Sequence, residues 1–141
     1  MAKLTVDIVT AERRVLTDEV DMIIAPASEG TVGILPRHAP LLTALIPGPM
    51  VLKRDGAEEV LAISGGFLQV AHDRVLILAD TAERADELDE QRATEARARA
   101  EQALQEARSG GGLQAEAAQM ALRRSLVRLN VAQRRRRRVQ P

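Results

Sequence analysis

The chain has 141 residues, enough for one medium-sized domain or for a small domain with an appendage. It contains no cysteine, which excludes disulfides and thiolate zinc sites, and its only aromatic residue is one phenylalanine, which excludes aromatic platforms for stacking bases. The formal charge of zero hides an asymmetry. Residues 1–83 carry seven basic and twelve acidic side chains, whereas residues 84–141 carry thirteen arginines and eight acidic side chains, so we expect two modules with different partners.

The first ten residues, MAKLTVDIVT, lack the apolar run of a signal peptide, and no stretch of the chain approaches the length of a membrane span. We therefore expect an intracellular, water-soluble protein with no direct membrane insertion. From Lys3 the sequence KLTVDIV alternates, with Leu4, Val6 and Ile8 on one face. This period of two predicts a half-buried strand.

Strand-like runs continue to about residue 84. They are VDMIIA, TVGIL, LLTAL, MVLKR, EVLAIS, FLQVA and RVLILA, and they are separated by SEG, PRHAP, IPGP, RDG, SGG and HDR. Short strands at this spacing, with no helical run between them, predict an antiparallel β-sandwich or barrel rather than a parallel α/β sheet.

From about Asp86 the composition shifts to alanine, glutamate, glutamine, arginine and leucine, which are strong helix formers. One helix is expected over about 86–108, the glycines of Ser109–Gly112 end it, and a second helix is expected over about 113–134. The short loop predicts an antiparallel hairpin. The expected apolar stripes are Leu88, Arg92, Ala96, Ala100, Leu104 and Ala107 on the first helix, and Ala115, Ala118, Leu122, Leu126 and Leu129 on the second.

The sequence thus predicts a β domain over 1–84 and an α-helical hairpin over 85–141. The hairpin's seam is mostly alanine, which buries little apolar area, so its tertiary partner should decide whether it stays folded. Opened into one line, the two helices would form an arm of roughly 70–80 Å at 1.5 Å per residue. A hairpin that opens into an arm is a hypothesis for a switch.

The sequence offers no obvious catalytic site. His38 and His72 lie in separate turns without metal-ligand spacing, and the chain has no nucleophile elbow, P-loop or dinucleotide fingerprint. The paired carboxylates Asp18–Glu19 and Glu58–Glu59 stand beside strand ends, where solvated charges are common. We therefore expect a protein that is not an enzyme on its own and that requires no metal or cofactor.

Five consecutive arginines, Arg134 to Arg138, allow three interpretations. They could bind nucleic acid or a membrane surface, they could favour the negative end of a helix dipole, or they could dock on an acidic patch of a protein partner. Five consecutive residues cover every face of a helix, so the run does not indicate binding to one particular groove of a partner.

Four segments, VDIVTAE, SEGTVGILPRHAPLLTAL, LAISGGFLQV and VLILADTAERADELDEQRA, followed by the Ala/Arg-rich hairpin, resemble the epsilon subunit of bacterial F-type ATP synthase. The resemblance covers essentially the whole chain in order. It implies an N-terminal β-sandwich of about ten strands and a C-terminal two-helix antiparallel hairpin.

The resemblance also implies a non-catalytic subunit of the central stalk, which couples proton flow to rotation and ATP synthesis. It implies a peripheral location at the cytoplasmic face of the bacterial membrane, with the gamma subunit and the ring of c subunits as partners. An extended hairpin would reach the catalytic alpha and beta subunits and inhibit ATP hydrolysis, which favours a protein partner for the arginines. The implied contacts with the c ring are Ser28, Glu29, Gly30, Thr31 and His38, where Thr31 replaces an acidic residue of some relatives.

The alternative of another class is a β-domain adaptor whose arginine-rich hairpin binds nucleic acid. Such an adaptor should bind oligonucleotides with a steep salt dependence, whereas a stalk subunit should co-purify with gamma and bind no nucleic acid.

The stretch LDEQRA matches a motif through which some bacterial relatives bind ATP as a regulatory ligand. The resemblance implies a candidate ATP site made of Glu83, Leu88, Asp89, Arg92, Ala93, Arg99, Arg124 and Arg128. An arginine that strong binders carry early in the second helix is missing near Ala117. A competing interpretation is that LDEQRA is only the acidic first turn that any helix favours.

Overall fold

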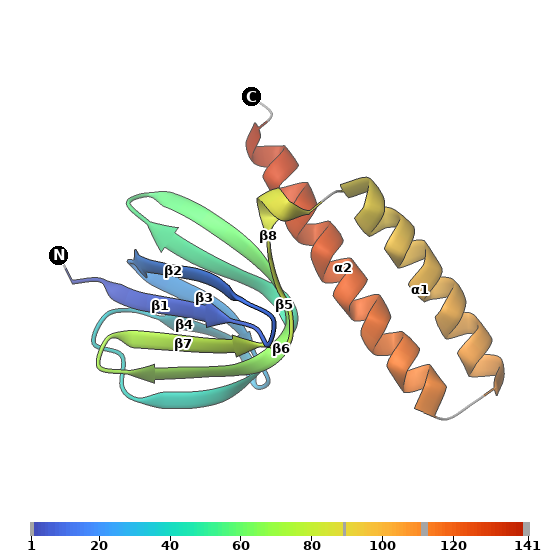
Figure 1. Cartoon of the computed structure of the whole chain (residues 1–141), viewed down its shortest axis with the longest axis horizontal. Helices are drawn as coiled ribbons and strands as arrows, with labels where there is room; N and C mark the ends of the chain where they lie inside the picture. The colour runs from blue at the N-terminus through green and yellow to red at the C-terminus, as the bar shows by residue number, and fades with distance from the viewer. Residues whose placement is uncertain (1, 89, 111–112, 140–141) are drawn as a thin grey trace. The chain divides into compact units, whose positions relative to one another are not determined.

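The computed structural model describes residues 2–88, 90–110 and 113–139, and the chain divides into two compact units, Met1–Arg84 and Ala85–Pro141. Strands make up the first unit and helices the second (Figure 1). Each unit is described by itself. Among the described residues, no helix is both long enough and apolar enough to span a membrane.

The first unit is a β-sandwich built from one continuous sheet in the order β2-β1-β7-β6-β5-β3-β4, with β8 paired to β6. The described strands are β1 (Leu4–Val9), β2 (Arg14–Val20), β3 (Met22–Ala27), β4 (Gly30–Ile34), β5 (Leu41–Arg54), β6 (Ala57–Ala71), β7 (Arg74–Ala79) and β8 (Ala82–Arg84). Strands β5 and β6 pair along their whole length as one long ribbon, which takes part in both layers of the sandwich. The middle of β6 also pairs with β8, and its second half pairs with β7.

The core forms because the strands alternate, as the sequence predicts. In β1, Leu4, Val6 and Ile8 are fully buried. In β7, Val75 and Ile77 are buried in the same way. The buried cluster is completed by Val20, Ile23, Ala25, Ile34, Leu45, Met50, Leu52, Leu61, Ile63, Leu68, Val70, Ala79 and Ala82.

The strand count differs from the expected ten. Two predicted breaks, IPGP and SGG, lie inside the continuous strands β5 and β6, so four predicted runs become two strands. The structure adds β2 and β8, which lack a clear run of alternating apolar residues. The sandwich is also not wholly antiparallel, because β1 pairs with β7 in parallel.

The glycines of SGG do not break the strand. They allow β6 to pass close to β7. Gly66 has a φ of 123°, and a Cβ atom placed there would lie 2.0 Å from the carbonyl oxygen of Leu78. No other amino acid fits at this position without moving the backbone of β7. The strand continues through Gly66, where it pairs with Ala79.

The second unit holds a short 3-10 helix, η1 (Ala85–Glu87), followed by α1 (Glu90–Gly110) and α2 (Leu113–Val139). The first helix was expected from about residue 86, but its opening residues form the 3-10 turn, in which the Leu88 N–H donates to the carbonyl of Ala85 at 3.3 Å. The second helix runs past the expected end at 134, because arginine is a good helix former and the run contains no helix breaker.

The two helices pack against each other as the expected antiparallel hairpin (Figure 1). Two positions of the predicted stripes are wrong. Arg92 is exposed while its neighbour Ala93 is buried, and Leu126 is 39% exposed while its neighbour Ser125 is buried. Spacings of three and four fit either choice in each pair, so the pattern alone could not fix the rotation of the helices. The other buried residues of the hairpin are Ala100, Leu104, Ala107, Leu129, Val131 and Ala132.

Candidate functional site

One outer surface of the sandwich is apolar, although it faces away from the core. It crosses β5, β6, β7 and β1, and the strand register aligns Ala44, Phe67, Leu78 and Val9 in one row. The largest exposed fractions are 70% for Leu42, 57% for Phe67, 50% for Leu78, 42% for Ile46 and 36% for Leu76. We call this surface the apolar face, and it consists of Val9, Leu42, Ala44, Ile46, Phe67, Leu76 and Leu78.

An exposed apolar patch of this kind marks an interaction surface. The sequence reasoning missed it, although RVLILA carried a signal. In β7, Val75 and Ile77 point into the core while Leu76 and Leu78 point outward, so the strand is apolar on both faces. A strand that is apolar on both faces is typical of a sheet that is covered on both sides.

The residues expected to contact the c ring lie at the two ends of β4. Ser28, Glu29, Gly30 and Thr31 are all exposed, and they form or adjoin the turn that precedes the strand. The Ser28 N–H donates to the carbonyl of Ala44 at 3.0 Å, which fixes this turn against β5. The loop with His38 follows the far end of β4, so the structure does not bring His38 next to the turn.

His38 is half-buried and is held by its own loop. Its Nδ1 lies 2.7 Å from the carbonyl oxygen of Ala39, and its N–H donates to the carbonyl of Leu35 at 3.1 Å. The neighbouring Arg37 N–H donates to Asp73 Oδ1 at 2.6 Å, which ties the loop to the turn between β6 and β7. Within the part of the chain that the structure describes, no three acidic, histidine or cysteine side chains gather as a metal site.

A cluster of charges fastens one end of the sandwich. Lys3 Nζ lies 2.7 Å from Asp21 Oδ1 and 2.9 Å from Asp55 Oδ1, and the Asp55 N–H donates to Asp21 Oδ2 at 2.8 Å. These hydrogen bonds, chiefly that of Asp21, raise the pKa of Lys3 above its ordinary value. The bond from Lys3, followed by that from the Asp55 backbone, lowers the pKa of Asp21. The cluster therefore joins the chain's start to two turns.

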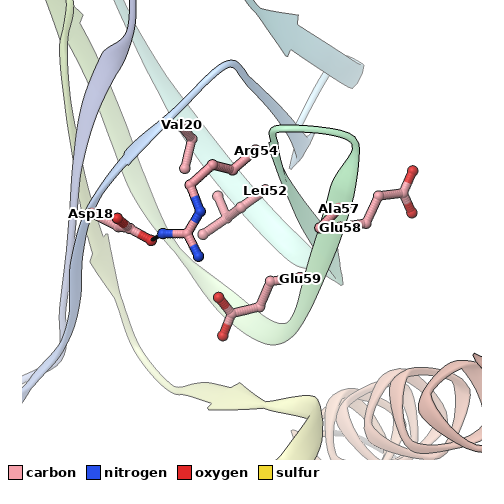
Figure 2. A pocket seen from close by; sticks show the side chains of 7 residues that line it. All are labelled: Asp18, Val20, Leu52, Arg54, Ala57, Glu58 and Glu59. Carbon is pink, nitrogen blue, oxygen red and sulfur yellow. Dashed lines mark hydrogen bonds and ion pairs between the residues drawn. The ribbon is translucent and has the colours of Figure 1, made fainter. Parts of the chain in front are cut away.

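A small pocket of about 130 Å³ lies nearby, and Figure 2 shows its lining. Asp18 pairs with Arg54 across it, and Glu59 pairs with Arg84 at 2.6 Å. The remaining lining residues are Val20, Leu52, Ala57 and Glu58. Because Asp18 and Glu59 each pair with an arginine on another strand, these carboxylates join strands of the sandwich.

The predicted ATP-site residues are spread over both units. Glu83 lies on β8, opposite Ala62 of β6, whereas the others belong to the helical unit. Leu88 precedes α1 and is half-buried, and Asp89 lies outside the described residues. The motif's Ala93 is 5% exposed, so it forms part of the helix seam.

The four arginines of this set lie on the two facing helices. Arg92 and Arg99 are exposed on α1, and Arg124 and Arg128 are half-buried on α2, one turn apart. In an antiparallel hairpin, residues equally far from the loop lie at the same level, which places Arg99 level with Arg124. Arg92 and Arg128 each already have an interaction partner. Four guanidinium groups along one hairpin suit an anion with several charges, because arginine binds phosphate oxygens in pairs.

Comparison with known proteins matches both units. Residues 3–85 match the family described as ATP synthase, Delta/Epsilon chain, beta-sandwich domain, and residues 86–133 match the family described as ATP synthase, Delta/Epsilon chain, long alpha-helix domain.

Among relatives, the ATP synthase epsilon chain of Herpetosiphon aurantiacus is 56% identical, over 96% of this chain and 98% of its own length. The ATP synthase epsilon chain of Moorella thermoacetica is 48% identical, over 94% of this chain and 98% of its own length. A chain in the mitochondrial ATP synthase of Euglena gracilis shares the fold, with a TM-score of 0.76 and 24% identity, over 87% of this chain and 77% of that one.

Proposed function

The chain belongs to the delta/epsilon chain family of ATP synthase, and we propose that it works as a non-catalytic rotor subunit of the central stalk. In this role it couples proton translocation to ATP synthesis at the cytoplasmic face of the bacterial membrane. The single observation that carries the proposal is the full-length likeness to epsilon chains, which covers the sandwich and the hairpin together.

The apolar face supports docking of the sandwich on the gamma subunit. A subunit that turns with the stalk must stay attached under torque, which favours a broad apolar contact over scattered ion pairs. Phe67 lies at the centre of the face, between Ala44 and Leu78 in the strand register, as expected for the residue that dominates binding.

The exposed turn of Ser28, Glu29, Gly30 and Thr31 is the proposed contact with the polar loops of the c ring. Since His38 lies beyond the other end of β4, it would contact the ring only if the ring's surface spans the length of that strand. Thr31 carries no charge, so hydrogen bonds rather than an ion pair would be made at that position.

The hairpin is the proposed inhibitory element. The buried residues of its seam include four alanines and Ser125, which bury little apolar area, so the seam holds the two helices together weakly. Helix α2 carries eight arginines and one glutamate, and this charge suits an acidic segment on the alpha and beta subunits once the helices extend.

ATP is the proposed regulatory ligand of the folded hairpin. Binding at Arg92, Arg99, Arg124 and Arg128 would stabilise the hairpin by mass action and oppose its extension. A calorimetric titration of the chain with ATP tests this. We expect saturable binding that is lost in Arg92→Ala and kept in Arg97→Ala, which removes an exposed α1 arginine outside the motif. If no binding were measured at millimolar ATP, LDEQRA would be only the acidic first turn of a helix and not a ligand site.

Binding to isolated gamma subunit tests the rotor assignment. We expect a one-to-one complex, and a loss of about 100-fold in affinity for Phe67→Asp, because a carboxylate would be buried without a partner. Leu126→Asp is the matched control, since it places the same charge on an exposed leucine of α2. If Phe67→Asp bound gamma as tightly as the wild type, the apolar face would not be the docking surface.

A further inference from the structure

One turn of the sandwich carries an arginine where the backbone favours glycine. Residues 35–38 form a β-turn, since the His38 N–H donates to the carbonyl of Leu35 at 3.1 Å. Pro36 holds the second position of this turn, and Arg37 holds the third with a φ of 68°. This is the pattern of a type II turn, whose third position requires a positive φ and is therefore usually glycine.

Arg37 differs from the other residues with a positive φ. Among the described residues, the remaining non-glycine positions of this kind are Asp55, His72 and Asp73. Aspartate and histidine are several-fold enriched in this region of backbone conformation, whereas arginine is not. Nothing in the arginine side chain favours the conformation, and backbone strain of this kind clusters at functional sites. The turn therefore marks a candidate contact.

Distant and local hydrogen bonds hold the turn in this conformation. The Arg37 N–H donates to Asp73 Oδ1 at 2.6 Å, across 36 residues of sequence. His38 is half-buried, and its Nδ1 lies 2.7 Å from the carbonyl oxygen of Ala39. The turn is thus preorganised, so little conformational entropy would be lost when a partner binds it.

The turn presents one apolar and one cationic side chain. Leu35 is 54% exposed, and Arg37 is exposed as well. In residues 2–88, 90–110 and 113–139, as far as their side chains are described, no ion pair uses the Arg37 guanidinium. Because a guanidinium offers a rigid fork of donors, an arginine beside an exposed leucine suits a carboxylate that lies next to an apolar spot.

The position of the turn favours one partner. Strand β4 separates it from the exposed turn that is the proposed contact with the c ring, and the five residues of β4 span about 16 Å at 3.3 Å per residue. Strand β4 is also the last strand in the sheet order, so one of its edges has no neighbouring strand. A surface that repeats identical loops, as a ring of subunits does, can contact the turns at both ends of this edge at once.

We propose that Arg37 pairs with a carboxylate on a polar loop of the c ring, and that Leu35 shields this ion pair from water. The inference rests on the proposed function and deepens it, because it names a contact residue and the chemical group that this residue recognises. Glycine at position 37 would relieve the strain but would lack the guanidinium, so the turn gives up stability for binding.

Two measurements on the same variant test this pairing. They are thermal unfolding of the full chain and binding of purified c ring, in an uncharged detergent, to the immobilised full chain. Arg37→Gly should raise the Tm by about 2–4 °C, because the backbone strain is relieved. It should also weaken ring binding about tenfold and make that binding less sensitive to salt, because a charge-assisted pair is lost.

Two further variants serve as controls. His72→Gly relieves a φ of 51° in the neighbouring turn, so it should leave ring binding unchanged. Arg37→Lys keeps the charge but not the fork of donors, so it should weaken ring binding only about threefold.

Three results would overturn the pairing. Ring binding by Arg37→Gly that equals the wild type would show that the arginine makes no contact. A lower Tm in Arg37→Gly would show that the arginine contributes stability and that the turn gives up none for binding. Binding to phosphatidylglycerol vesicles that depends on Arg37, without such a dependence for the ring, would assign the arginine to lipid headgroups.

The wild-type chain separates this inference from the proposed function. If the wild type binds the ring and Arg37→Gly binds it equally well, only the pairing is overturned and the proposed ring contact stands. If the wild type binds gamma but does not bind the ring, the proposed ring contact is overturned together with the pairing.

Discussion

Gly66 lies in β6 between its partners on β5 and β7, and the absence of a side chain there lets these strands keep their register. A side chain there would meet the Leu78 carbonyl oxygen at 2.0 Å, and the φ of 123° is unfavourable for any residue with a Cβ. The glycine therefore fixes the surface on which Phe67 and Leu78 lie side by side.

Gly66→Ala should lower the free energy of unfolding by about 3 kcal/mol or more, because it combines a steric clash with backbone strain. Urea unfolding of the full chain measures this. Gly56→Ala is the matched control, since Gly56 also has a positive φ, of 80°, but no atom lies within 4 Å of its would-be Cβ. That variant should lose only about 1 kcal/mol. Equal losses of unfolding free energy in the two variants would show that the close approach to Leu78 does not contribute to the loss of stability.

The cluster of Lys3, Asp21 and Asp55 gives stability that depends on pH. The pKa of Asp21 lies below its ordinary value of 3.8 in the folded chain, so its contribution is present above that value and is lost as the pH falls through the folded pKa. The pKa of Lys3 is raised above 10.5, so its contribution is lost only as the pH rises beyond that value.

Asp21→Asn should therefore destabilise the chain between about pH 5 and pH 9, and the difference from the wild type should shrink as the pH falls below about 4. Thermal unfolding at several pH values measures this. Glu12→Gln, in the bend between β1 and β2, controls for the loss of one exposed carboxylate. A wild-type advantage that stayed constant down to pH 2 would contradict the assigned cause.

At the scale of elements, the sequence predicted most of the strands and both helices, because alternation in β1 and β7 and the change to helix formers after Arg84 are local signals. It failed where the deciding contact is distant. The sequence pattern predicts a break at SGG, since nothing local shows that Gly66 passes close to Leu78. In α2, spacing could not distinguish Ser125 from Leu126 as the buried residue.

The same distinction between local signals and distant contacts applies to the candidate sites. The arginines of the hairpin could be placed from the sequence, because their levels depend only on helix geometry and the position of the loop. The apolar face could not, because it requires the register of β5, β6, β7 and β1. Leu42 and Val9 are 33 residues apart, and only the pairing of four strands puts them on one surface.

The hairpin's proposed role as an inhibitor can be tested by locking it. Ala100 and Ser125 are buried small residues of facing helices at nearly the same level, and the chain has no native cysteine to interfere. A disulfide between cysteines at these two positions should abolish inhibition of ATP hydrolysis in the assembled enzyme, and reduction should restore it. The hydrolysis rate before and after reduction is the measurement. Full inhibition in the oxidised protein would show that inhibition does not require the helices to separate.

At the scale of the molecule, two units of different character fit two tasks. The sandwich has a firm core and an exposed apolar face, as suits a permanent attachment. The hairpin has an alanine-rich seam and excess arginine on α2, as suits a contact that is made and broken. The opposite net charges of the two parts of the chain, already visible in the sequence, follow the same division.

The most direct test of the rotor assignment is proton-driven ATP synthesis by membranes whose ATP synthase lacks its own epsilon subunit. Added wild-type chain should restore synthesis, and Leu126→Asp should restore it equally, whereas Phe67→Asp should restore little because it cannot stay on the stalk. Failure of the wild-type chain to restore synthesis, or full restoration by Phe67→Asp, would contradict the account.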